Sequence, residues 1–171
     1  LNIYAILLTH HHSDHTGGVK DILNFTRVPV FSPDKKIPGT TNMVKHDEKI
    51  NLKFISFNIF ATPGHTMDHI VFYSKSKKIL FSGDTLFRLG CGKVFEGTYK
   101  QMFNSLKMLE NLEDETSVFC GHEYTINNLQ FLKSIFKKNA KLAKIEKEIE
   151  KQLKDSKKTI PFNLGKEKKN N

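Results

Sequence analysis

The chain has 171 residues, of which 38% are hydrophobic, with two cysteines and a formal net charge of +9. This length supports one domain with a hydrophobic core and is too short for two ordinary domains. No apolar run approaches the ~20 residues that a membrane-spanning helix needs, and two cysteines are too few for a disulfide framework. The composition therefore argues against a membrane-spanning chain and against a small disulfide-stabilised scaffold.

The positive charge is concentrated towards the C-terminus. Close to half of the basic residues lie in the last forty positions, all as lysine. Surfaces that bind phosphate usually combine arginine with aromatic side chains, so we expect a solvated lysine-rich helix and no nucleic-acid partner. The few cysteines favour a reducing, cytoplasmic compartment. Because the chain begins with Leu1, a mitochondrial or other organellar location stays open.

Hydrophobic periodicity and turn residues predict strands that alternate with helices. Residues 28–31 predict a strand at a sheet edge because of Pro29, and 32–50 predict mostly loop. The predicted elements are, in chain order, strands at 3–8, 28–31 and 54–60, a hairpin at 70–73 and 79–81, a helix at 99–109, a strand at 116–120, helices at 125–136 and 139–153, and a weakly ordered remainder.

Ligand-type side chains follow the ends of four of these strands. Side chains alternate along an extended chain, so His10 and His12 point to one side and His11 to the other. A turn towards the helix that begins at Gly17-Gly18 brings Asp14 and His15 to the same cavity. With the later strand ends, the candidate metal ligands are His10, His12, Asp14, His15, His65, Asp84 and His122.

Seven ligands are too many for one zinc-like ion, which takes three or four, and suit two ions. With the ions ~3.5–4 Å apart, a carboxylate can bridge them and a shared hydroxide becomes nucleophilic near neutral pH. We predict Asp84 as the bridge, because Gly83 before it allows a close approach of the backbone.

Three longer strings of residues resemble one family. They are THHHSDHTGG at 9–18, GDTLFRLGCGKVFEGT at 83–98 and CGHEYTINNL at 120–129. The first is typical of the metallo-β-lactamase superfamily, and the other two resemble the glyoxalase II (hydroxyacylglutathione hydrolase) family within it. The resemblance covers residues from about 1 to 132.

The resemblance implies an α/β fold, the αββα sandwich, without its first strands. We therefore expect an N-terminally incomplete metal-binding domain at 1–124, and a truncated helical region with a Lys/Asn-rich tail at 125–171. It implies hydrolysis of the thioester of S-lactoylglutathione to glutathione and lactate by a metal-bridging hydroxide, in methylglyoxal detoxification. The implied cofactors are two divalent ions, zinc first, with iron or manganese as alternatives. We expect a monomer.

Matching positions imply the roles of individual residues. His10, His12 and His65 would hold the first metal, and Asp14, His15 and His122 the second. Asp84 would bridge the metals, and Asp14 and Asp84 would be the catalytic carboxylates. Lys93 and Tyr124 match positions that contact the glutathione part of the substrate, whereas Phe95 stands where the family often has a hydrogen-bonding tyrosine.

Other interpretations stay open. Within the fold they are a lactonase, a β-lactamase-like enzyme, a nuclease or a persulfide dioxygenase. Outside enzymes, a non-catalytic metal-binding module or an inactive fragment also fits, because the ends that the family carries are not matched here. For His11 we expect a structural role, and for His69 packing or support of the ligands.

Overall fold

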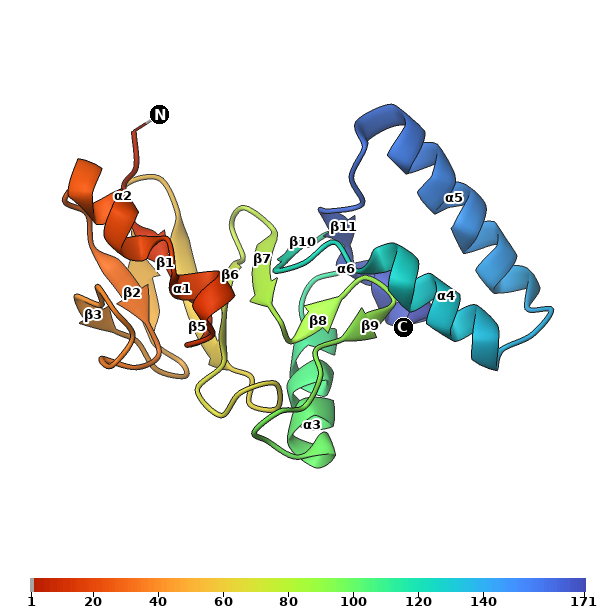
Figure 1. Cartoon of the computed structure of the whole chain (residues 1–171), viewed down its shortest axis with the longest axis horizontal. Helices are drawn as coiled ribbons and strands as arrows, with labels where there is room; N and C mark the ends of the chain where they lie inside the picture. Colours follow the sequence, from red (N-terminus) through yellow and green to blue (C-terminus); the bar gives the residue numbers. More distant parts are fainter. Residues whose placement is uncertain (1) are drawn as a thin grey trace.

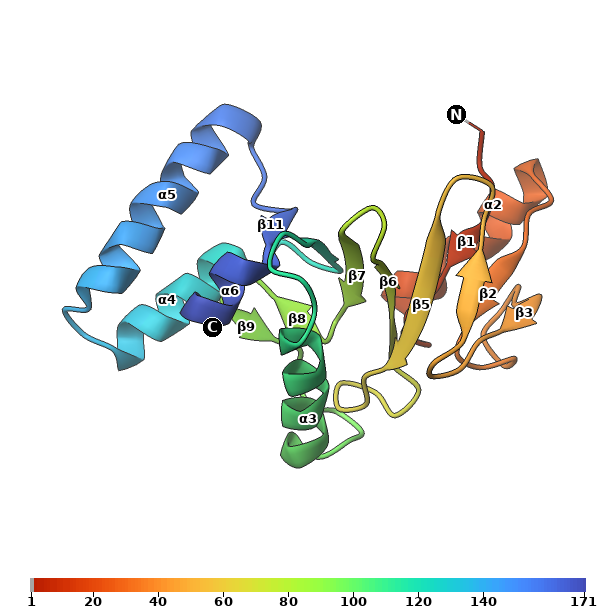
Figure 2. The same ribbon diagram turned by 180° about the vertical axis from the view of Figure 1, so that it is seen from behind.

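The computed structural model describes residues 2–171 and is built from two main β-sheets (Figures 1 and 2). The first sheet is parallel, in the order β1 (Ile6–Leu7), β2 (Val30–Ser32) and β3 (Asn42–Met43). The second has the order β11 (Phe162–Asn163), β10 (Ser117–Cys120), β7 (Ile79–Gly83), β6 (Ile70–Ser74), β5 (Ser56–Ala61) and β4 (Lys49–Asn51). A ribbon of β8 (Leu86–Phe87) and β9 (Gly90–Cys91) follows β7. The helices are α1 (Ser13–Thr16), α2 (Val19–Phe25), α3 (Tyr99–Glu110), α4 (Thr125–Ile135), α5 (Ala140–Ser156) and α6 (Leu164–Asn170).

Three hydrophobic clusters hold four layers together. Val19 of α2 packs on Leu8 and Val30 at the outer face of the first sheet. Between the sheets, Phe57, Ile59 and Phe72 pack against Leu7 and Phe31. On the far face of the six-stranded sheet, α3 packs on Val71, Leu80 and Val118 through Leu109. Each fully buried side chain of this size stabilises the fold by ~1.5–3 kcal/mol, and the order α2, sheet, sheet, α3 confirms the predicted αββα sandwich.

The register of the central strands brings two ligand-bearing loops together. β6 and β7 pair antiparallel, which confirms the predicted hairpin. β10 lies parallel to β7 with Cys120 opposite Gly83, so both strands end at the same edge. Gly83 has φ +49°, and a Cβ there would lie 2.6 Å from Thr9 Oγ1; a Cβ on Gly121 would lie 2.3 Å from Asp84 Oδ1. Both close approaches require glycine.

Two expectations about the fold are wrong. β2 is the central strand of its sheet and not an edge strand. Pro29 lies just before β2, and its carbonyl accepts the N–H of Ile6 at 3.0 Å, so the proline does not interrupt the pairing of the strand. The part after α5 is ordered: β11 pairs with β10, and α6 buries Leu164 and Glu167. The many lysines and asparagines hid this segment, because Phe162 and Leu164 are its only buried hydrophobic side chains. Residues 32–50 are mostly loop, as expected, apart from the last residue of β2 and the short strands β3 and β4.

The helices of the C-terminal region pack beside the ribbon, at the end of the molecule away from β3 (Figure 1). Leu129 of α4 and Leu142, Ile145 and Ile149 of α5 form a cluster with Leu89. None of the helices in residues 2–171 has the length and apolar character needed to cross a membrane. The boundary predicted at residues 124 and 125 stays a prediction.

Candidate metal centre

The loop after β1 carries four of the predicted ligands. It is fixed to the six-stranded sheet, because the Ile70 N–H donates to the Thr9 carbonyl at 2.8 Å. His10 is fully buried directly after this anchor. At His12 the chain turns into α1, and the N–H of His15 donates to the His12 carbonyl at 3.0 Å. This turn brings Asp14 and His15 to the side of the site that His10 and His12 already face.

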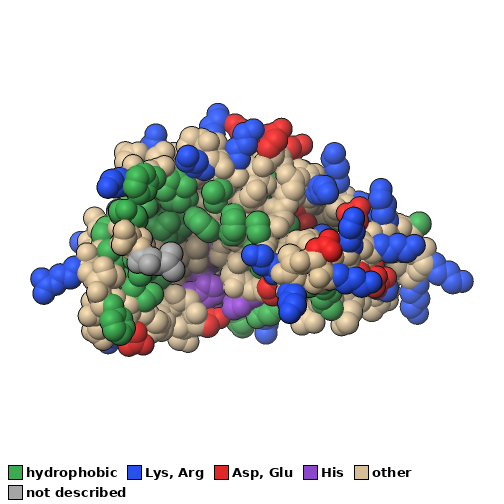
Figure 3. Space-filling model, turned by 90° about the horizontal axis from the view of Figure 1, so that it is seen from above, with side chains coloured by type: hydrophobic (Ala, Val, Ile, Leu, Met, Phe, Trp, Pro, Cys, Tyr) green, Lys and Arg blue, Asp and Glu red, His purple; other side chains and the backbone are tan. Residues whose placement is uncertain are grey.

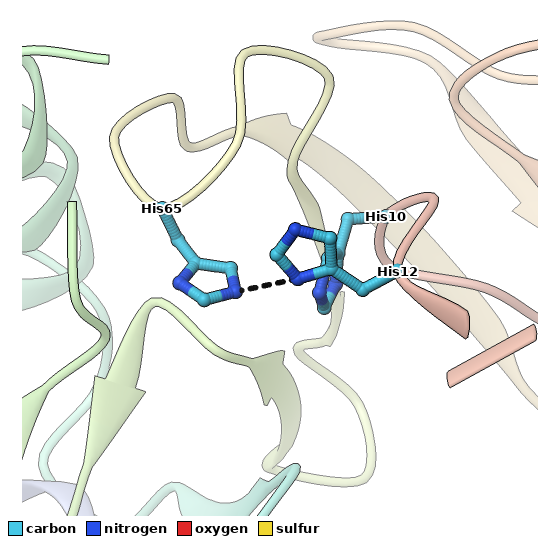
Figure 4. Close-up of side chains that lie close together, drawn as sticks. All are labelled: His10, His12 and His65. Carbon is cyan, nitrogen blue, oxygen red and sulfur yellow. Dashed lines mark hydrogen bonds between the residues drawn. The ribbon is translucent and has the colours of Figure 1, made fainter. Parts of the chain in front are cut away.

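His10, His12 and His65, which we call the first ligand trio, have donor atoms within 4.8 Å of one another (Figure 4). The dashed line in Figure 4 joins His12 Nδ1 to His65 Nε2, which lie 3.1 Å apart. The Nδ1 of His65 contacts the Lys93 carbonyl at 2.7 Å, so this nitrogen is the donor and Nε2 keeps the lone pair with which it could bind a cation. The Nε2 of His10 is buried and has no hydrogen-bond partner. A ring nitrogen in this position needs a partner.

Asp14, His15 and His122 form the second ligand trio, again with donor atoms within 4.8 Å of one another. His15 Nε2 lies 3.3 Å from His122 Nε2, and His122 Nε2 lies 3.3 Å from Asp14 Oδ2. This trio is more exposed than the first. In the space-filling view, histidine side chains are visible in a hollow between hydrophobic side chains and a lysine-rich half of the surface (Figure 3).

Asp84 lies between the two trios. Its Oδ1 is 3.3 Å from His15 Nε2, and its Oδ2 is 3.5 Å from His65 Nε2 and 3.4 Å from His122 Nε2. Oδ1 is buried and accepts no hydrogen bond. One carboxylate therefore lies within 3.5 Å of candidate ligands from both trios, and its role as the bridge stays a prediction.

The electrostatics of the site favour neutral imidazoles at His10 and His12 and an ionised carboxylate at Asp84, whereas the hydrogen bond to Asp84 raises the pKa of His15. Burial, and next the neighbouring His69, lower the pKa of His10 to about 2, and burial together with His65 lowers the pKa of His12. Burial opposes ionisation of Asp84, but its contacts with His15, His122 and His65 together outweigh burial and hold the pKa of the carboxyl below its usual value. Unprotonated imidazoles with carboxylates form the donor set that divalent cations of the zinc type prefer. The residues present fit two such ions.

His69 supports the site from beneath. It is fully buried, and its Nε2 accepts the backbone N–H of Asp84 at 3.0 Å. Its Nδ1 lies 2.9 Å from Thr62 Oγ1 and 3.0 Å from Thr85 Oγ1, and its ring stacks on His10 at 4.8 Å. Both ring nitrogens of His69 therefore have partners within the protein, and its ring orients the Asp84 backbone, in line with the supporting role expected for it. The two threonines had no signal of their own in the sequence.

The predicted substrate contacts lie at the rim of the site. The Lys93 ammonium is 4.9 Å from the centre of the Phe95 ring, which meets the rings of His12 and His65 edge to face. On the opposite side, Tyr124 stacks on His122 with ring centres 4.8 Å apart and an angle of 14°. Lys93 and Tyr124 thus flank the two trios, and their role in binding substrate stays a prediction.

Known proteins resemble the chain along its whole length. A model of the metallo-beta-lactamase superfamily matches residues 1–49 and 38–122, and a model described as the hydroxyacylglutathione hydrolase C-terminus matches 123–171. A hydroxyacylglutathione hydrolase of Nitrosomonas eutropha is 42% identical over 170 residues, which are 98% of this chain and 66% of that protein. The chain thus spans just under two thirds of the length of this relative.

Solved structures share the fold. ETHE1 from Myxococcus xanthus superimposes with a TM-score of 0.66 at 31% identity, over 72% of this chain and 56% of that one. TTHA1623, solved in a di-iron-bound form, superimposes with a TM-score of 0.62 at 31% identity, over 71% of each chain.

Proposed function

The chain belongs to the metallo-beta-lactamase superfamily, and we propose that it hydrolyses the thioester of S-lactoylglutathione to glutathione and lactate. The observation that carries the proposal is Asp84, whose carboxylate lies within 3.5 Å of histidines from both ligand trios. The match of residues 123–171 to the hydroxyacylglutathione hydrolase C-terminus supports this branch of the superfamily, and so do curated relatives with that name.

Each trio is proposed to hold one divalent ion, with Asp84 between them. Bound in this way, such ions polarise the thioester carbonyl as Lewis acids and lower the pKa of water to near neutrality. We propose zinc, because three histidines in one trio and two histidines with a carboxylate in the other match its usual ligands. Iron is the alternative supported by the di-iron form of TTHA1623, since imidazole and carboxylate ligands also suit it.

The chain's own residues bind and orient the substrate. The Lys93 ammonium attracts the carboxylates of glutathione, and the Tyr124 hydroxyl is available to donate a hydrogen bond from the opposite rim. Phe95 covers the edges of His12 and His65 and limits water on that side. A thiolate is a good leaving group, so the reaction does not require a strong general acid from the chain.

The test is turnover of S-lactoylglutathione by the zinc-loaded chain, with bound metal quantified on the same sample. We expect about two zinc ions per chain, and turnover that Asp84→Asn lowers by about 10³-fold, because the carboxamide does not carry the charge shared by both ions. His46→Ala, a change at a histidine remote from the trios, is the matched control. Turnover that survives Asp84→Asn unchanged, or two bound ions without turnover, contradicts the proposal.

A further inference from the structure

His11 stands between two proposed ligands and points away from them. Its Nδ1 lies 3.0 Å from Asp68 Oδ1, and its Nε2 lies 3.2 Å from Glu96 Oε1. Each ring nitrogen thus faces a carboxylate from a different loop. Sequence reasoning found the direction of His11 but neither partner.

Both carboxylates are fixed by a second contact. Asp68 Oδ1 also accepts the Thr66 hydroxyl at 2.6 Å, and Glu96 Oε2 accepts the Met67 N–H at 2.7 Å. Thr66 and Met67 directly follow His65. The His11–Asp68–Glu96 cluster therefore joins the loop that carries His10 and His12, the loop that carries His65, and the loop that carries Lys93 and Phe95.

Backbone contacts extend this connection to the rim. The N–H groups of Phe95 and Glu96 point to the His65 carbonyl at 3.2 and 3.4 Å. The Lys93 carbonyl holds the His65 ring at 2.7 Å. A displacement of Glu96 is thus transmitted both to the ring of a metal ligand and to the two side chains at the rim.

We propose that His11 is a positioning residue. Through its contacts with Asp68 and Glu96, it fixes the position of His12 relative to His65 and holds the Lys93–Phe95 loop over the centre. The proposed effect of His11 on metal affinity rests on the geometry alone. Its proposed effect on substrate binding also rests on the proposed function. The three side chains are close enough to hold a cation themselves, but both nitrogens of His11 already have a carboxylate partner.

The size of the expected effect separates positioning from general stability. The side chains of His11, Asp68 and Glu96 are 42%, 19% and 38% exposed, so their pairwise attraction is screened by solvent and adds little to folding. The same contacts connect three loops to one another. They also hold the imidazole of His11 at both nitrogens. Loss of His11 should therefore change the geometry of the centre more than the stability of the chain.

The test compares His11→Ala with His46→Ala, the same change at a histidine of similar side-chain exposure, 46%. For each full-length variant we would measure the zinc dissociation constants by competition with a chromophoric chelator, kcat and KM for S-lactoylglutathione, and the unfolding temperature without metal. For His11→Ala we expect zinc binding weakened by about tenfold, the range found when support of a metal ligand is lost. We also expect a higher KM, and an unfolding temperature close to that of His46→Ala.

Glu96→Gln and the double variant His11→Ala/Glu96→Gln give a second readout. If the residues act through one cluster, the double variant binds zinc no more weakly than His11→Ala alone. Additive losses, or zinc affinity and KM equal to those of His46→Ala, would overturn the proposal. If the parent chain binds zinc without turnover, the proposed function fails, while the zinc affinities still decide the role of His11.

Discussion

The two ligand trios use similar residue types in different surroundings. His10 and His65 of the first trio are 0% and 4% exposed, whereas the side chains of Asp14 and His122 in the second are 58% and 25% exposed. The first trio is held by contacts behind its rings, to Thr9 and to the Lys93 carbonyl. The second depends on the turn into α1 and on the close approach of Gly121. We expect burial to preorganise one half of the centre, and exposure to leave the other half open to the proposed substrate and to exchange of the proposed ion.

The strongest test of this difference is a pair of ligand deletions. We expect His65→Ala to weaken binding of one ion by more than the ~10–100-fold that loss of a supporting partner costs, and to abolish turnover. We expect a smaller loss for His122→Ala, because water reaches the second trio and can replace a ligand there. Metal content after dialysis and turnover on the same samples measure both effects. Equal losses in the two variants would show that burial does not distinguish the trios.

A pH titration of the metal-free chain sharpens the comparison next. Burial lowers the pKa of His69 to about 3 and that of His10 to about 2. Below pH 6.5 these two histidines therefore bind protons in the unfolded chain but not in the folded chain. The free energy of unfolding falls as the pH falls from 6.5 towards 4, by up to ~1.4 kcal/mol per pH unit for each histidine. Urea unfolding with a chelator present measures the slope. His69→Gln should make the slope of unfolding free energy against pH shallower, and His46→Ala should leave this slope unchanged. An unchanged slope in His69→Gln would contradict the prediction.

A buried carboxyl group away from the site predicts the opposite dependence of stability on pH. Glu167 is 4% exposed and accepts the Leu89 N–H at 2.6 Å, and burial raises its pKa to about 7. Its contribution to stability is complete below pH 4.5 and is lost as the pH rises through about 7. Glu167→Gln should therefore stabilise the chain by ~1–3 kcal/mol at pH 8 and have little effect at pH 4. Unfolding free energies at the two pH values measure this, and equal effects at both would contradict it.

The smallest expected effect concerns the rim. Phe95→Tyr adds a hydroxyl on an exposed ring beside Lys93, and one new hydrogen bond to glutathione is worth ~0.5–1.5 kcal/mol. We expect KM for S-lactoylglutathione to fall by about 2- to 10-fold with little change in kcat. Phe103→Tyr on α3, another exposed phenylalanine, is the control. A lower kcat with unchanged KM would show that Phe95 acts on the centre and not on substrate binding.

The sequence predicted the parts of the molecule in which a local residue pattern also determines where the side chains lie in space. The strand-end residues predicted the groups that converge on Asp84, because the ends of neighbouring strands meet at one edge. The sequence did not predict that Pro29 precedes a central strand, or that Glu167 and Leu164 fix the C-terminal segment. It also missed Asp68 and Glu96 as partners of His11. Asp68 and Glu96 lie 57 and 85 positions from His11, and Glu167 lies 78 positions from Leu89, so no local pattern reveals these contacts.

The central claim is that two ions share Asp84, and anomalous diffraction from crystals of the zinc-loaded chain tests it most directly. We expect two anomalous peaks ~3.5–4 Å apart, one bound by His10, His12 and His65 and the other by Asp14, His15 and His122, with Asp84 in contact with both. A single peak, or two peaks of which only one contacts Asp84, would contradict the account.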